Sequence, residues 1–516
     1  MSSNIEKIKN VLIVVLVSST ILLLYFLWND GGGFRLPVPG AVEIETILLK
    51  DVLNPDRLTV SFGEENYTEL SSPTPLWGGG GQARTDGDGD GEGAQGDPSF
   101  LDAFRVFSGS ADIMVGAISE SDFRDVMRAR SIQAEFTFAI PLSGFCGEYG
   151  LERPPQLDVI DAFTCIAYSE ASPNSVFICN KLDDRYYRLA IDGEAARFKE
   201  LIAYIEARSD ASFYPLRAYS GVENDVMVPL DMRSGLSETP YRSDMDGSLA
   251  GGDAITDMAK GFFGESFDFT RKITEGNGNT VYMYGYGEKV LIIHRDGSLE
   301  YRAAETGDGG SSGSAGYFEA LTLALDFIAR HGELESPGGA AKQIYLKSVG
   351  YADEGRRAYR FSFGVRIDGY AVHYVGSQPF VVEVAGGRVT YYARDMIDCM
   401  PEAGLAGGTE RSYAPFDLLA ENFQGIYLVL ADRDADGGPA AGPQAALSDE
   451  AMFDSVVERV SKVSVGLLRP APPGAGGAGA AAGPRSGELL PVWVLTIDGM
   501  DFYFGLYSGE GAGHTA

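Results

Sequence analysis

Residues 359–374 read YRFSFGVRIDGYAVHY, and this stretch decides the expected fold. Large apolar residues alternate with polar or small ones, as in a strand that is buried on one face. Asp368-Gly369 then matches the two-residue turn of a β-hairpin, and Tyr370–Tyr374 is the expected returning strand. One face of the first strand carries Tyr359, Phe361, Phe363, Val365 and Ile367, and the other carries Arg360, Ser362, Gly364 and Arg366.

Residues 492–506 repeat this pattern. Val492–Ile497 predicts a strand, Asp498-Gly499 a turn, and apolar residues alternate again to Leu506. Each hairpin follows an expected helix, Tyr317–His331 or Asp449–Ser461. One helix on an antiparallel sheet makes a small α+β domain. We therefore predict an α+β chain, with an N-terminal transmembrane helix followed by a multidomain ectodomain of antiparallel sheets, each packed by one or two helices.

Segments rich in Gly, Ala, Pro, Ser or Asp cannot supply a core, so they are expected to separate folded regions. The four segments of this kind are Gly78–Gly96, Ala303–Gly316, Asp432–Gln444 and Pro470–Gly487. The expected organisation begins with a cytoplasmic tail at 1–10 and a transmembrane helix at 11–28. A membrane-proximal α+β region at 31–302 follows, with a disordered insertion at 78–96. After a linker at 303–316 come an α+β unit at 317–400 and a second α+β unit at 410–516, the latter with a disordered insertion at 470–487.

The membrane-proximal region shows its own local signals. Asp97–Phe107 predicts a helix with Asp97 as N-cap, and Ser119–Ala129 predicts one with Ser119 and Asp122 as a capping box. Ile132–Ile140 alternates like a half-buried strand, and Asp192–Arg208 has the apolar stripe of an amphipathic helix.

The apolar segment Val11–Trp28 holds no charge in its 18 residues. A helix of this length rises roughly 27 Å, close to the thickness of the bilayer hydrocarbon. Lys7 and Lys9 precede it, so the N-terminus is expected in the cytoplasm and the bulk of the chain outside the cell membrane. Tyr25 and Trp28 fit the outer interface as aromatic anchors. A cleaved signal peptide would need a small-residue cleavage site, and none closely follows Trp28.

Charge and cysteine content narrow the function further. The formal net charge of −32 argues against nucleic acid and against electrostatic docking on anionic lipid. None of the four cysteines has CxxC spacing, which disfavours a zinc site. Cys165 and Cys179 would face each other in a hairpin of Phe163–Tyr168 with Ser175–Cys179. The residues leave open a disulfide between them or two free, buried thiols.

The motif matches fall in low-complexity stretches. Gly309–Gly313 matches a nucleophile elbow and Gly474–Gly479 a dinucleotide loop, but neither lies between a strand and a helix. Two segments begin like a calcium-binding loop, one with Asp86, Asp88 and Asp90 and the other with Asp432, Asp434 and Asp436. Both segments lack the closing Glu of such a loop, so a solvated acidic loop is favoured. We predict no catalytic residue, no cofactor and no metal ligand.

Four stretches resemble the YycH family of extracytoplasmic proteins, accessory to the WalK (YycG) sensor histidine kinase of Gram-positive bacteria. They are KIKNVLIVVLVSSTILLLYFLW, SFLDAFRVFSGS with ISESDFRDVMRARSIQAEFTFAIPL, YRFSFGVRIDGYAVHY with FVVEVAGGRVTYYAR, and the terminal LLPVWVLTIDGMDFYFGLYSGE. The last is also similar to YycI and PepSY-like domains. The Gly/Asp-rich insertions and the acidity depart from the family pattern.

The resemblance implies regulation without catalysis. Its expected partners are a WalK/YycG-like sensor histidine kinase and a YycI-like protein, contacted through transmembrane helices and ectodomains, with an effect on cell-wall metabolism. A cytoplasmic tail of about ten residues is too short to fold, so the signal would pass through the membrane helix. Val15, Ser18, Ser19 and Leu22 are the expected contact face. The alternatives are an extracytoplasmic hydrolase acting on the cell wall and a PepSY-like binding or inhibitory module.

Overall fold

The structure is a computed structural model, in which residues Thr46–Ala516 form one compact unit. The predicted membrane segment Val11–Trp28 and its contact face lie outside the described residues. No helix within the described ranges is long and apolar enough to cross a membrane. The described residues are 47–71, 75–78, 97–110, 112–209, 213–230, 233–243, 245, 252–304, 316–332, 342–352, 355, 358–399, 406–436, 448–470 and 486–515.

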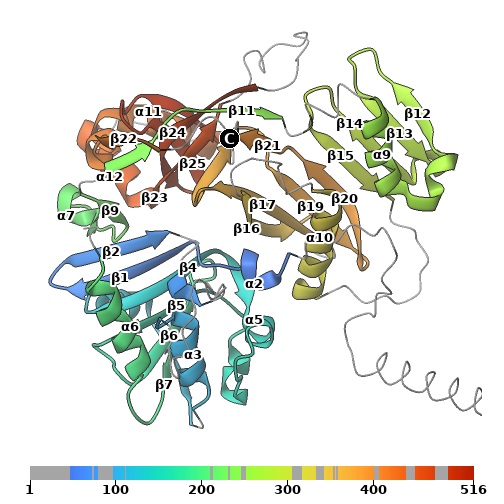
Figure 1. Cartoon of the computed structure of the whole chain (residues 1–516). Coiled ribbons are helices and arrows are strands. Elements are labelled where there is room, and N and C mark those ends of the chain that lie inside the picture. The colour runs from blue at the N-terminus through green and yellow to red at the C-terminus, as the bar shows by residue number, and fades with distance from the viewer. Residues whose placement is uncertain are drawn as a thin grey trace, which may run out of the picture. The chain divides into compact units, whose positions relative to one another are not determined.

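The N-terminal half of the described chain is built on a nine-stranded antiparallel sheet, here the N-terminal sheet, in the order β3-β7-β6-β5-β4-β1-β2-β8-β9, and Figure 1 labels most of these strands. Its strands are β1 Arg57–Gly63, β2 Asn66–Ser71, β3 Met114–Ile118, β4 Ser131–Pro141, β5 Ala162–Ser169, β6 Ser175–Asn180, β7 Arg185–Ala190, β8 Phe213–Pro215 and β9 Met227–Pro229. The helices of this region are α2 Leu49–Val52, α3 Phe100–Ser108, α4 Glu120–Met127, α5 Leu142–Glu148, α6 Ala196–Glu206 and α7 Arg217–Ser220.

Local chemistry explains where these helices begin. Ser119 and Asp122 form the predicted capping box, since each side chain bonds the other residue's backbone N–H. The predicted N-cap of helix α3, Asp97, is wrong. The observed N-cap is Ser99, whose hydroxyl accepts from the Asp102 N–H at 3.2 Å. Helix α6 begins at Ala196, not at Asp192, because Gly193 has a φ of 120°, outside the helical region.

The helices cover the two faces of the N-terminal sheet differently. Phe198 of α6 packs on Phe100 of α3 and Tyr168 of β5, with ring centroids 5.1 Å apart in both pairs. On the opposite face, Phe123 of α4 packs on Phe177 and Tyr186. Because α4 covers only part of that second face, the strands β1, β2 and β4 present polar side chains beside it.

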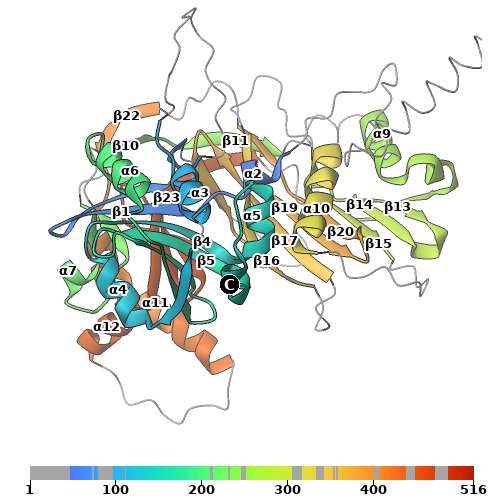
Figure 2. The same cartoon turned by 90° about the horizontal axis from the view of Figure 1, so that it is seen from below.

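The C-terminal half forms a 15-stranded sheet, here the C-terminal sheet. Figure 2 shows β15, β20, β19 and β17 side by side. Its strands are β11 Thr239–Ser243, β12 Arg271–Thr274, β13 Thr280–Tyr284, β14 Lys289–Ile293, β15 Leu299–Ala303, β16 Lys342–Tyr351, β17 Ala358–Ile367, β18 Tyr370–Tyr374, β19 Phe380–Ala385, β20 Arg388–Arg394, β21 Ile397–Cys399, β23 Val460–Arg469, β24 Ser486–Ile497, β25 Met500–Gly505 and β26 Gly511–His514. Two further strands, β10 Arg233–Leu236 and β22 Ala406–Arg411, pair separately.

Both predicted hairpins are confirmed. In the first, Ile367 pairs with Tyr370, and in the second Ile497 pairs with Met500. Asp368 and Asp498 both have a φ of 50°, and the glycine after each is also left-handed, as this tight turn requires. The strands β18 and β23 run parallel and join the two hairpins in one sheet. With its mainly antiparallel sheets and packed helices, the fold is α+β, as predicted.

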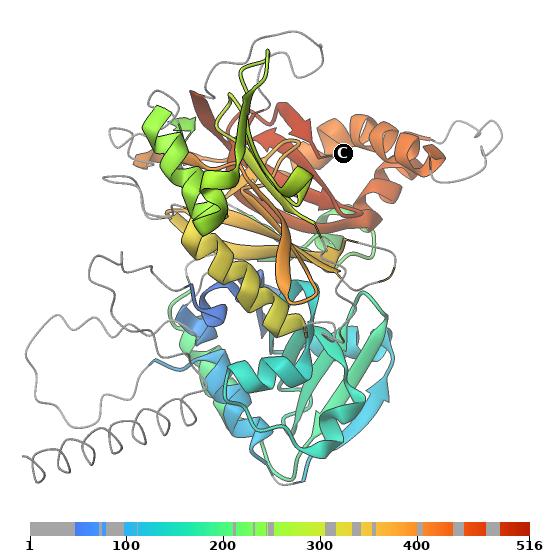
Figure 3. The ribbon, with the colours of Figure 1, turned by 90° about the vertical axis from the view of Figure 1, so that its right-hand side faces the viewer.

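Within the described ranges, the C-terminal sheet is accompanied by the helices α9 Gly252–Phe263, α10 Tyr317–His331, α11 Pro415–Asp436 and α12 Asp449–Arg459. Helix α10 has the predicted bounds and packs on β17, β19 and β20 (Figure 3). Helix α12 ends at Arg459, two residues before the prediction, because Val460 starts β23 by pairing with Ile497. The prediction of a loop from Asp432 is wrong up to Asp436, since these residues complete α11.

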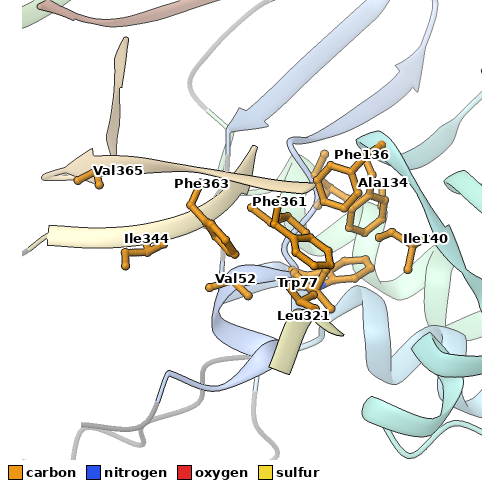
Figure 4. Packing of buried hydrophobic residues seen from close by; sticks show 14 of the residues in the cluster. Val52, Trp77, Ala134, Phe136, Ile140, Leu321, Ile344, Phe361, Phe363 and Val365 are labelled. Carbon is orange, nitrogen blue, oxygen red and sulfur yellow. The ribbon is translucent and has the colours of Figure 1, made fainter. Parts of the chain in front are cut away.

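The hydrophobic core is continuous between the two sheets. Trp77 is fully buried and lies with its ring centroid 5.4 Å from that of Phe100 and 5.6 Å from that of Phe136. Phe361 and Phe363 of β17 belong to the same buried cluster, together with Leu321 of α10 (Figure 4). The apolar face predicted for β17 is therefore the face that builds this core.

Candidate functional site

A cavity of about 1160 Å³ is lined by strands of both sheets and by α4. Ligand pockets commonly measure about 300–1,000 Å³, so this volume suits a ligand larger than most small metabolites. Its N-terminal wall comes from β1, β2 and β4, and its C-terminal wall from β16, β17, β18, β23 and β25. We call it the intersheet cavity.

Strand register places the polar residues of the N-terminal wall next to one another. Arg57 pairs with Glu135 across β1 and β4, and Thr59 pairs with Glu69 across β1 and β2. Leu58 and Val60, between them in sequence, point to the core on the other face. The alternation of β1 therefore separates a charged face from an apolar one.

Carboxylates and cations on the N-terminal wall neutralise one another. Glu135 forms ion pairs with Arg57 and with Lys181 through its two carboxylate oxygens. Burial opposes ionisation of Glu135, yet these two cations outweigh it and hold its pKa well below the usual range. Burial lowers the pKa of Arg57 and of Lys181, but Glu135 and the other acidic groups around each cation together outweigh it, so both pKa values are raised.

Glu69 is the exception on this wall. Its carboxylate Oε2 is buried without a hydrogen-bond partner in the described part of the chain, and the nearest cation, Arg57 Nη1, is 3.9 Å away. Burial raises the pKa of Glu69 to about 7, because Arg57 offsets only part of the desolvation. Glu69 therefore exchanges its proton near neutral pH.

The C-terminal wall is the polar face of a continuous set of strands. Lys462, Thr496 and Asp501 lie side by side across β23, β24 and β25. The Thr496 hydroxyl donates to Asp501 Oδ1 at 2.7 Å. His373 of β18 lies with Nδ1 3.9 Å from Asp501 Oδ2, and burial lowers the pKa of His373 to about 4, so its imidazole is neutral at pH 7.

Two glycines inside strands shape this wall. A Cβ on Gly364 would lie 2.3 Å from the ring of Tyr345, and a Cβ on Gly466 would lie 2.7 Å from the ring of His373. Glycine in a strand interior often marks such a close approach. These two glycines therefore let Tyr345 and His373 lie flat against neighbouring strands.

Arg366 lies over Tyr345, with its guanidinium carbon 3.8 Å from the ring centroid. The residue is only 6% exposed, and its guanidinium makes no hydrogen bond or ion pair with any described residue. Burial lowers the pKa of Arg366, and the attraction of Tyr345 and Asp56 does not offset it. The pKa of Lys347 is lowered in the same way, and its ammonium also has no partner within the described ranges.

Direct contacts join the two walls at the edge of the cavity. Asp56, just before β1, forms an ion pair with Lys462 of β23. Burial opposes ionisation of Asp56, but Lys462, Arg57 and Arg366 together lower its pKa. The Asn224 side chain donates to the carbonyls of Val457 and Val460 at 2.7 and 2.8 Å.

The sequence did not single out this site. The alternation placed Arg366 on the second face of β17, where a charged residue ordinarily meets solvent, and nothing nearby marked that face as a cavity wall. The signal that could have helped is the pair of glycines, Gly364 and Gly466, inside predicted strands.

Of the residues predicted from sequence, Cys165 and Cys179 lie directly opposite each other in β5 and β6, as expected. Both are buried free thiols in the structure, which is the second of the two alternatives, and the disulfide stays a prediction. Asp432, Asp434 and Asp436 belong to α11, where Asp434 pairs with Arg459, so they do not form the loop that calcium coordination requires. Val15, Ser18, Ser19, Leu22, Tyr25 and Trp28 lie outside the described residues.

Metal-ligating residues do not gather in the described part of the chain. No group of three or more His, Cys, Asp or Glu side chains there could hold a metal ion.

No protein-family model matches this chain, and no curated protein matches it by sequence. Among solved structures, the chain is similar to YycH from Bacillus subtilis, with a TM-score of 0.50 and 10% identity, over 89% of this chain and 97% of that one. The C-terminal domain of YpeB from Bacillus megaterium matches with a TM-score of 0.20 and 12% identity, over 51% of this chain and 96% of that one, a likeness too low to support an inference. The chain thus has a YycH-like fold.

Proposed function

We propose that this protein is a membrane-anchored extracytoplasmic regulator of a two-component sensor histidine kinase that controls cell-wall metabolism. The observation that carries the proposal is the YycH-like fold, which extends over 89% of this chain and 97% of the YycH chain. The sequence resemblance to the same family, in four separate stretches, supports it from an independent direction.

The proposed regulator acts through contacts at two levels. Val11–Trp28 would anchor it beside the kinase, with Val15, Ser18, Ser19 and Leu22 on the shared face. Small and hydroxyl-bearing residues let transmembrane helices approach closely and hydrogen-bond. The ectodomain would contact the kinase and a YycI-like protein outside the membrane.

Co-purification tests this proposal. The full-length chain is expressed with its candidate sensor kinase, extracted in detergent and captured, and the co-eluting kinase is measured. Replacing Ser18 and Ser19 by leucine should reduce the captured kinase several-fold. In a helix of 3.6 residues per turn, Val17 and Leu24 would lie opposite that face, so Val17→Ala with Leu24→Ala is the matched control. If the serine replacements leave the amount of captured kinase unchanged, the proposed contact through the membrane helix is wrong. If the native chain captures no kinase, the proposed function itself is contradicted.

A wall hydrolase remains the second candidate because one observation favours it. Glycoside hydrolases use one carboxyl with a raised pKa and one ionised carboxylate, and Glu69 and Glu135 differ in this way. Against it, both carboxylate oxygens of Glu135 are engaged in ion pairs, with Arg57 and with Lys181, which lowers the basicity that a nucleophilic or basic role needs. Hydrolysis of purified cell wall by the native chain, abolished by Glu69→Gln, would favour this second candidate over the regulator.

A further inference from the structure

We propose that the intersheet cavity binds an anionic ligand, and that Arg366 and Lys347 on its C-terminal wall bind a carboxylate or phosphate group of that ligand. The site goes beyond the proposed function and does not require it, because it follows from the cavity walls alone.

The first observation is the isolation of Arg366. A buried arginine ordinarily has a carboxylate partner, because removing an unpaired cation from water is unfavourable. Arg366 is 6% exposed and lines the cavity, and its guanidinium makes neither hydrogen bond nor ion pair in the described part of the chain. The guanidinium lies over the ring of Tyr345, and its N–H donors make no hydrogen bond within the described ranges.

The second observation is the charge around this wall. Arg366 and the Lys347 ammonium line the cavity and make no ion pair with a described residue, whereas Lys462 is paired with Asp56. The lining of the whole cavity carries nine carboxylates and seven cations. The position for an anion is therefore the part of the C-terminal wall where Arg366 and Lys347 lie without a carboxylate in an ion pair.

The third observation is the rest of the cavity. Its volume of about 1160 Å³ far exceeds a single phosphate or carboxylate, and apolar residues such as Phe123, Met227 and Trp493 also line it. The anionic group is therefore one end of a larger ligand. Guanidinium binds the oxygens of carboxylate and phosphate in similar two-point geometry, so the wall itself fits both.

Isothermal titration calorimetry on the full-length chain in detergent tests the site with two probes, inorganic phosphate and citrate, at constant ionic strength. Binding of either probe to the native chain supports the site, and the preferred probe gives the class of the anionic group. Arg366→Gln should weaken binding by about tenfold to a hundredfold, the range that one or two charge-assisted hydrogen bonds supply. Lys347→Gln should weaken it less, because an ammonium binds the anion from one point only.

Arg360→Gln is the matched control. Arg360 lies on the same strand and the same face as Arg366, but outside the cavity, and it is half exposed and paired with Glu383. Its replacement should leave the affinity unchanged. Absence of binding by both probes at millimolar concentration, or undiminished binding by the Arg366→Gln, Lys347→Gln double variant, would overturn the proposal.

A second measurement keeps the test valid if a variant is less stable. The Arg366 guanidinium makes no ion pair with a described residue, and its burial outweighs the attraction of Tyr345 and Asp56. Arg366→Gln should therefore unfold in urea at a midpoint equal to or above that of the native chain. A clear fall in that midpoint would mean that Arg366 serves the fold and not a ligand, and it too would overturn the proposal.

Discussion

The two walls of the intersheet cavity carry similar residues in opposite electrostatic states. On the N-terminal wall, Arg57 and Lys181 share Glu135, and all three are held ionised by one another. On the C-terminal wall, Arg366 and Lys347 have no such partner within the described ranges, and burial lowers the pKa of each. The difference teaches that buried charge alone does not mark a binding site. What marks it is a buried charge whose partner is absent from the protein.

The largest expected effect tests whether the stability of the N-terminal wall depends on its ion pairs. Glu135→Gln leaves Lys181 without its carboxylate and Arg57 with only the distant Glu69. Removing one member of a buried pair typically destabilises a protein by about 3–5 kcal/mol. We expect a loss of this size in urea denaturation of the full-length chain. Glu383→Gln, which breaks the half-exposed pair with Arg360, should lose about 1 kcal/mol or less. Equal losses in the two variants would contradict the stated role of Glu135.

The pH dependence of the free energy of unfolding tests the role of Glu69 on the N-terminal wall. Its folded pKa of about 7 lies above the ordinary value of 4.5, so the folded state binds more protons than the unfolded state between these values. Stability conferred by protonated Glu69 is therefore present below pH 4.5 and is lost as pH rises through 7. Glu69→Gln should stabilise the chain by on the order of 3 kcal/mol at pH 8 and by almost nothing at pH 4.

Urea midpoints at the two pH values check this prediction. Glu64→Gln, at an exposed position in the β1–β2 turn, is the matched control and should change neither midpoint. A stabilisation of Glu69→Gln that is the same at pH 4 and pH 8 would show that ionisation of Glu69 is not its cause.

The smallest effect concerns the support of Arg366. Gly364→Ala places a Cβ 2.3 Å from the ring of Tyr345, so the ring must move. The Arg366 guanidinium then loses its contact with the face of that ring. Overpacking of this kind costs about 1–3 kcal/mol. We expect a loss in that range together with weaker citrate binding. Gly350→Ala, on β16 with open space around its Cα, should leave both properties as they are. If Gly364→Ala binds citrate with the native affinity, the Tyr345 ring does not contribute to the binding site.

Local patterns predicted most elements of the fold. The alternation of residues 359–374, the two Asp-Gly turns and the capping box at Ser119 each depend on neighbours in sequence, so they could be found without the structure. Helix α11 escaped prediction because its apolar residues do not form one clear stripe, and its last turn is rich in Asp. The parallel pairing of β18 with β23 joins segments about 95 residues apart, which no local pattern encodes.

The cavity could not be predicted because its chemistry depends on that long-range pairing. Asp56 and Lys462 form an ion pair across 406 residues of sequence. Arg360 and Arg366 occupy equivalent places in the alternation of β17, yet one pairs with Glu383 at the surface and the other is buried alone. Sequence gives both residues the same face, and only the packing of the second sheet distinguishes them.

The most direct test is an experimental structure of the full-length chain in the presence of saturating citrate. Our account predicts a carboxylate of the citrate within hydrogen-bond distance of the Arg366 guanidinium, with the ring of Tyr345 on its other side and the Glu135 ion pairs unchanged. A structure in which Arg366 instead turns to bind a carboxylate of the protein, such as Asp56, and no citrate lies on the C-terminal wall would contradict it.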